Sequence, residues 1–186
     1  MFNDFYGIYK DARDGSWRFL IDYKISALPI DFNIVAKAMG IKIRQDTHGI
    51  LLPAERGATI TDGTRTYILL KPSNIQTMRY TTAHEFGHIF LGHTMKNGRY
   101  GRTFADSPEE YQAERFAIDI LAPACVLWGL DLHTPEDIAR VCNISMTSAQ
   151  KRARRIEELY RRNMFLSHPL ERQVYQQFRR FISENR

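Results

Sequence analysis

The residues from His84 to His88 read His-Glu-Phe-Gly-His, and this spacing is the strongest constraint on how the chain can fold. Residues four positions apart lie on one face of an α-helix, so a helix lets both imidazoles reach one metal ion. Glu85 lies about 100° round the same helix, where its carboxylate can reach a water on that ion. The HExxH pattern is typical of zinc hydrolases. We therefore expect a helix in which His84 and His88 are zinc ligands and Glu85 is the general base.

Short apolar runs and turn residues predict a small β-sheet before this helix. Asp31 begins a short amphipathic helix that Gly40 ends. Apolar or β-branched runs follow at residues 41–43, 58–60 and 67–70. Glycines, prolines and the turn pair Asp62 and Gly63 separate these runs, which is the pattern of short strands.

The helix that carries HExxH is expected from near Ile75 to Gly92, followed by a polar loop at residues 95–106. Gly87 lies inside this helix, where glycine costs about 1 kcal/mol relative to alanine. A close approach of another backbone, or a crowded metal site, would explain a glycine at this position.

A second helix is expected after the loop, with Ser107 as its N-cap and Pro108 at its first position. It runs to Pro123, which ends it. Further helices are expected at residues 134–141, at residues 145–162 and from about Leu170, the last with one apolar side.

Catalytic zinc usually takes three protein ligands, so a third ligand must lie outside HExxH. The metzincin pattern HExxHxxGxxH requires glycine at position 91 and histidine at 94, where this chain has Leu91 and Thr94. His93 is one residue out of register and is better explained as a helix-end residue near the helix dipole. A third histidine of the metzincin kind is therefore excluded.

A glutamate from the second helix is the other solution, and that helix offers Glu109, Glu110 and Glu114. Glu109 and Glu110 lie on the two flanks of its apolar side at nearly equal angles, and Glu114 lies farther off. Acids in a first turn are also favoured by the helix dipole, and Glu110 could complete a capping box with Ser107. Helix periodicity alone leaves the choice open.

The block RYTTAHEFGHIFLGH, followed by EEYQAERFAIDILAP, resembles the ImmA/IrrE family of gluzincin-like zinc endopeptidases. The family's segments read rFTlAHElGH and ExxAnxFAxxLLmP, and the similarity spans roughly residues 26–123. The resemblance implies an α+β, zincin-like fold with a small sheet packed against an HExxH helix and a glutamate-bearing helix. It also implies that Glu110 is the third ligand. Glu114 stands where the family usually has asparagine or aspartate, as the residue that supports a ligating histidine.

The same resemblance implies a metalloprotease with one Zn²⁺ per chain. The expected reaction is hydrolysis of a peptide bond in a protein substrate, a helix-turn-helix transcriptional repressor, by a metal-activated water with Glu85 as general base. Such chemistry needs a donor for the oxyanion of the transition state. The candidates within reach along the sequence are Tyr100, Tyr111, His93 and Arg99.

The carboxyl-terminal third supports a rival interpretation. We expect a metallopeptidase domain at residues 1–130 and a helical region at 131–186, packed on the first. Residues 151–186 hold ten basic and four acidic side chains, and two helices joined by a short turn can read DNA. The alternative function is therefore a DNA-binding or protein-binding regulator with a structural or vestigial zinc site. Direct binding to nucleic acid is the less favoured of the two interpretations.

The amino terminus, the apolar stretches and the cysteines of the chain also indicate where in the cell the protein is located. The amino terminus lacks a basic region followed by an apolar run, and the most apolar later stretch, residues 120–130, is short and contains Pro123. These observations predict a cytoplasmic protein with no membrane partner. Cys125 and Cys142 form no CxxC pair, which argues against a zinc site built from cysteines.

Overall fold

The computed structural model describes residues 2–95, 98–100 and 107–186, which form helices and one four-stranded sheet. The chain divides into two compact units. The first contains the residues up to Gly15 together with Asp31–Ala117, and the second contains Ser16–Ile30 and Ile118–Arg186. These units group the residues differently from the predicted boundary near residue 130. The boundary at residue 130, between a metallopeptidase domain and a helical carboxyl-terminal region, stays a prediction.

The sheet belongs to the first unit, and its strand order is β1-β3-β2-β4. Its strands are β1 (Ile41–Gln45), β2 (Gly57–Thr61), β3 (Thr66–Leu70) and β4 (Arg99–Tyr100). Strand β3 pairs parallel with β1 and antiparallel with β2, and β4 adds antiparallel to β2. The three predicted strands are confirmed. Strand β4 lies in a segment predicted as loop, because two residues are too few to show the alternation of a strand.

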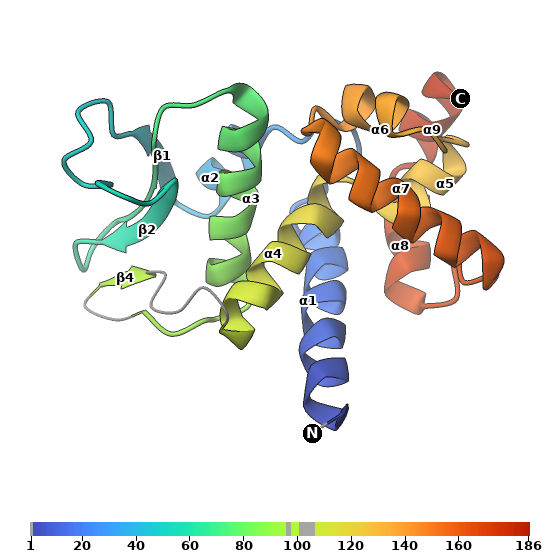
Figure 1. Cartoon of the computed structure of the whole chain (residues 1–186), viewed down its shortest axis with the longest axis horizontal. Helices are drawn as coiled ribbons and strands as arrows, with labels where there is room; N and C mark the ends of the chain where they lie inside the picture. The colour runs from blue at the N-terminus through green and yellow to red at the C-terminus, as the bar shows by residue number, and fades with distance from the viewer. Residues whose placement is uncertain (1, 96–97, 101–106) are drawn as a thin grey trace. The chain divides into compact units, whose positions relative to one another are not determined.

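The HExxH helix is α3 (Ile75–Phe90; Figure 1). It packs against β2 and β3. Asn74 caps it, its side chain accepting a hydrogen bond from the backbone N–H of Thr77 at 2.8 Å. The chain leaves the helix through Gly92, whose φ of +70° is a conformation that glycine adopts without strain. Before the sheet, α2 (Phe32–Ala38) is capped by Asp31 as predicted.

The glutamate-bearing helix is α4 (Pro108–Leu121), and Ser107 caps it by accepting from the backbone N–H of Glu110 at 3.2 Å. Its side chains Ala113 and Phe116 are fully buried. Helix α3 approaches it at Gly87, where an added Cβ would lie 3.1 Å from the Cα of Ala113. The predicted reason for a glycine here, the close approach of another backbone, is confirmed.

Helix α1 (Phe2–Asp22) was not predicted. Its buried residues include Ala12, Ser16, Phe19 and Leu20, which recur at helical spacing. Aspartates, arginines and Gly15 interrupt that pattern in the sequence. The apolar side of this amphipathic helix is therefore narrow and was not recognised.

The second unit is helical: it contains α5 (Ala124–Gly129), α6 (Pro135–Cys142), α7 (Met146–Arg161), α8 (Pro169–Gln177) and α9 (Arg179–Asn185). The pair α6 and α7 is confirmed. The single terminal helix predicted from Leu170 is wrong, because Phe178, with ψ of 0°, ends α8 and precedes α9 while its side chain stays buried. Helix α5 was also missed; it is short and follows directly after Pro123.

One of the basic residues of α7 is not a solvated charge. Arg152 is buried, donates to the carboxylate of Asp119 at 2.8 Å and to the carbonyl of Ala122, and so ties α7 to residues 119–122 within this unit. The tail is therefore less available to an acidic partner than its composition suggests.

The α+β, zincin-like architecture predicted from the sequence is confirmed: a small sheet packs against the HExxH helix, a glutamate-bearing helix follows, and the carboxyl-terminal region is helical. Within the described part of the chain, no helix has both the length and the apolar character needed to cross a membrane.

Candidate metal centre

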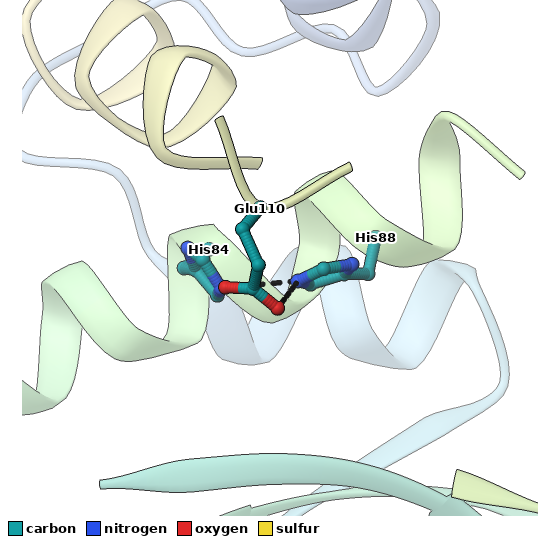
Figure 2. Close-up of side chains that lie close together, drawn as sticks. All are labelled: His84, His88 and Glu110. Atoms are coloured by element: carbon teal, nitrogen blue, oxygen red, sulfur yellow. Dashed lines mark hydrogen bonds and ion pairs between the residues drawn. The ribbon is translucent and has the colours of Figure 1, made fainter. Parts of the chain in front are cut away.

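Three side chains from two helices converge on one point (Figure 2). The Nε2 atoms of His84 and His88 are 3.0 Å apart, and the carboxylate of Glu110 reaches them at 3.3 Å and 3.4 Å. All three residues are between 5 and 8% exposed. One ligand atom from each lies within 4.8 Å of the others, so the group could hold a metal ion.

The chemistry of this cluster fits a cation. A carboxylate and two imidazole nitrogens present their electron pairs to one small buried space, and burying such groups together is costly unless a positive charge lies among them. Two histidines and one glutamate are also a ligand set of catalytic zinc, with a position left open for water.

The environment of Glu110 keeps its carboxylate ionised. Burial acts to raise the pKa of Glu110, but the interactions of its carboxylate with His84 and His88 outweigh burial and lower that pKa well below its usual range. An ionised carboxylate is the form that binds a metal ion.

Glu85 lies beside these residues, and its pKa is shifted in the direction opposite to that of Glu110. Burial raises its pKa, while His84 and a hydrogen bond from Thr59 act in the other direction. The hydroxyl of Thr59, on strand β2, donates to Oε2 of Glu85 at 2.8 Å. The pocket lined by His84, His88 and Glu110 is also lined by Glu85. A buried carboxylate with a raised pKa is well matched to accepting and returning a proton near neutral pH.

His93 lies behind His88 and does not face the cluster of ligand atoms. Its Nδ1 is 2.9 Å from Nδ1 of His88, and its Nε2 is 3.0 Å from Oε1 of Gln112. Burial, followed by the charge of His88, lowers the pKa of His93. Sequence reasoning missed Gln112 altogether, because no local pattern links a glutamine on α4 to a histidine beyond the end of α3.

The remaining transition-state candidates are placed differently. Arg99 lines the pocket and donates through Nη2 to Oε1 of Glu55 at 2.9 Å. Its Nε is buried without a hydrogen-bond partner among the described residues. Tyr111 is 43% exposed and is not among the residues that line the pocket. The side chain of Tyr100 lies outside the described part of the structure.

The two other glutamates of α4 also differ in position. Glu114 lines the pocket with Glu110. The carboxylate of Glu109 accepts instead from the backbone N–H of Thr94 at 3.4 Å. The structure thus brings Glu110, and not Glu109, to the two histidines.

The family model of Peptidase M78, described as the IrrE N-terminal-like domain, matches residues 36–154, and the chain belongs to this family. The resemblance seen in the sequence is thereby confirmed. The match extends beyond α4 through α6 and ends inside α7, so it covers the candidate metal centre, α6 and the first part of α7. No curated protein matches the chain.

Proposed function

We propose that the chain is a zinc-dependent endopeptidase in which His84, His88 and Glu110 hold one Zn²⁺ and Glu85 is the general base. The observation that carries the proposal is the buried convergence of two imidazoles and one carboxylate, with a second carboxylate of raised pKa in the same pocket. Membership of a peptidase family supports it independently.

Zinc bound there would supply Lewis-acid polarisation of a water molecule and of the scissile carbonyl. Glu85 would take the proton from the water and deliver it to the leaving amine. Thr59 would hold Oε2 of Glu85 in place, so that the other carboxylate oxygen handles the proton.

We further propose Arg99 as the donor to the oxyanion. It lines the pocket, and its buried Nε has no hydrogen-bond partner among the residues described, so an N–H is available there. His93 uses both ring nitrogens elsewhere, and Tyr111 does not line the pocket. Tyr100 stays a prediction. Glu114, at the pocket wall, is the proposed support of a ligating histidine.

The proposed substrate is a helix-turn-helix transcriptional repressor, as the family resemblance implies. The test is to measure zinc content and cleavage of a repressor encoded beside the chain's own gene. Glu85→Gln should keep one zinc per chain and lose cleavage. Glu110→Ala should lose zinc, whereas Glu109→Ala, its neighbour on α4, should keep it. A Glu85→Gln protein that still cleaves would remove Glu85 from the mechanism, and a wild-type chain without zinc would refute the metal site.

A second candidate function is binding to duplex DNA through α6 and α7. Asn143 makes the turn between the two helices in a left-handed conformation, and α7 exposes Thr147, Gln150, Lys151 and Arg154 on one side. Binding that weakens steeply with salt, in a chain that cleaves no repressor, would favour this function over the first.

A further inference from the structure

We propose that Gln112 and His93 form a hydrogen-bond relay that fixes His88 in the one neutral tautomer able to bind a metal ion. The inference rests on the proposed function in taking His88 as a metal ligand. The relay runs from Gln112 on α4, through His93, three residues beyond the end of α3, to Nδ1 of His88.

The direction of each hydrogen bond follows from the acceptor at the far end. Oε1 of Gln112 can only accept, so Nε2 of His93, 3.0 Å away, carries a hydrogen and donates it. A neutral imidazole carries one hydrogen, which leaves Nδ1 of His93 with a lone pair. That lone pair accepts from Nδ1 of His88 at 2.9 Å. Neutral His88, the form that binds a metal ion, therefore has its hydrogen on Nδ1 and its lone pair on Nε2.

The lone pair of His88 Nε2 lies where the candidate metal centre needs it. This atom is 3.0 Å from Nε2 of His84 and 3.4 Å from Oε1 of Glu110. With the opposite tautomer, Nε2 of His88 would itself carry a hydrogen, and the metal would have to displace it from this ligand atom. The relay keeps that hydrogen off Nε2 of His88 before the metal arrives, so that this atom can accept from Nε2 of His84.

The fold places His93 for this role. Gly92, with a φ of +70°, turns the chain back at the end of α3, and the backbone N–H of His93 donates to the carbonyl of His88 at 3.0 Å. His93 is thus joined to His88 twice, through the backbone and through the rings. It is only 8% exposed, so solvent is a poor substitute for either ring contact.

Helix α4 supports His88 from two directions. Glu110 reaches its Nε2 directly, and Gln112, two residues later, acts on its Nδ1 through His93. Removing a residue that orients a ligating histidine typically weakens metal binding about 10- to 100-fold. We expect a loss in this range when His93 can no longer accept, and a smaller loss when only Gln112 is removed.

The experiment compares variants that keep or remove an acceptor, using zinc alone as the probe. His93→Leu removes the acceptor for His88, whereas His93→Gln retains a carbonyl that can accept. Gln112→Leu removes the terminal acceptor, whereas Gln112→Glu keeps one. Gln173→Leu, at an exposed position of α8, is the matched control. The zinc Kd is measured by competition with a chromophoric chelator.

The second readout is the tautomer of His88 in metal-free protein, from the ¹⁵N shifts of its ring nitrogens. The wild type should show the Nδ1–H form, and Gln112→Leu should increase the Nε2–H form. His93→Leu should raise the zinc Kd about 10- to 100-fold, with His93→Gln between it and the wild type. If His93→Leu does not fold, the relay is judged from Gln112→Leu and Gln112→Glu, because Gln112 is partly exposed and its replacement is easier to accommodate.

An Nε2–H tautomer of His88 in the wild type would overturn the relay, as would equal zinc Kd values for folded His93→Leu and wild type. These results are distinguishable from failure of the peptidase proposal. A wild type that binds zinc and cleaves no repressor refutes the activity but leaves the relay intact. A wild type that cleaves, with variants unchanged in Kd and tautomer, refutes only the relay.

Discussion

Replacing Gly87 by alanine should weaken the metal centre, although Gly87 offers no ligand atom. A Cβ at this position would lie 3.1 Å from the Cα of Ala113 and 3.1 Å from Cδ1 of Phe116, with the carbonyl oxygen of Ala113 at 3.3 Å. Ordinary contacts of a Cβ begin near 3.4 Å. The Ala113 atoms are backbone and cannot rotate away, so α3 and α4 must separate by a few tenths of an ångström.

Two opposing terms set the size of the effect on stability. Alanine in a helix interior is about 1 kcal/mol more favourable than glycine. Overfilling a packed core costs about 1 to 3 kcal/mol. The net change should be a loss of about 0 to 2 kcal/mol in the free energy of unfolding. Glu110 lies three residues before Ala113, on the same turn of α4, so separation at Ala113 also moves the Glu110 carboxylate away from His88. We expect a several-fold rise in the zinc Kd.

The assay combines urea unfolding of metal-free protein with chelator competition for zinc. Gly7→Ala is the matched control, because Gly7 also lies inside a helix, α1, and an added Cβ there would meet nothing within 4 Å among the described residues. This control should gain up to about 1 kcal/mol and keep its zinc affinity. If Gly87→Ala gains as much as Gly7→Ala and binds zinc equally well, the argument from close approach is refuted.

Three further predictions concern single contacts. Thr59→Val should lower kcat about tenfold, because it removes the hydroxyl that holds Glu85, and Thr59→Ser should restore most of it; steady-state cleavage rates check both. Glu85→Gln should stabilise the metal-free protein at pH 8. Burial raises the folded-state pKa of Glu85, so stability present below its unfolded pKa of about 4.3 is lost as pH rises through the folded value. The advantage of the variant should vanish below about pH 4 in thermal unfolding. Asp119→Leu should cost about 3 to 5 kcal/mol in urea unfolding, because Arg152 keeps its charge in a buried site, and adding Arg152→Leu should recover part of that loss.

The features that the sequence predicted well are those set by neighbours along the chain. The limits of α3 follow from Asn74 and Gly92, and the two histidines share a face because they are four residues apart. The strands were found because alternation and turn residues are local as well. The same logic explains the misses, since the two residues of β4 carry no pattern and the polar residues of α1 obscure its buried side.

The choice between Glu109 and Glu110 could not be made from periodicity. Adjacent residues are about 100° apart on a helix, and these two lie on opposite flanks of the apolar side of α4. Which flank faces α3 depends on how the two helices cross, and no local signal carries that information. Family resemblance selected Glu110, and the structure brings its carboxylate to both histidines, while Glu109 lies near Thr94.

The crossing itself depends on the glycine inside the HExxH pattern. Because Gly87 has no side chain, Ala113 approaches the backbone of α3 directly, one residue before His88. That approach brings the turn of α4 just before Ala113 to the histidines, so Glu110 reaches His84 and His88, and Gln112 reaches His93. A larger residue at position 87 would move Glu110 and Gln112 together away from the histidines. The cost of a glycine inside this helix is therefore offset, because the missing side chain lets α4 come close enough to place the proposed third ligand, Glu110, and the relay residue Gln112.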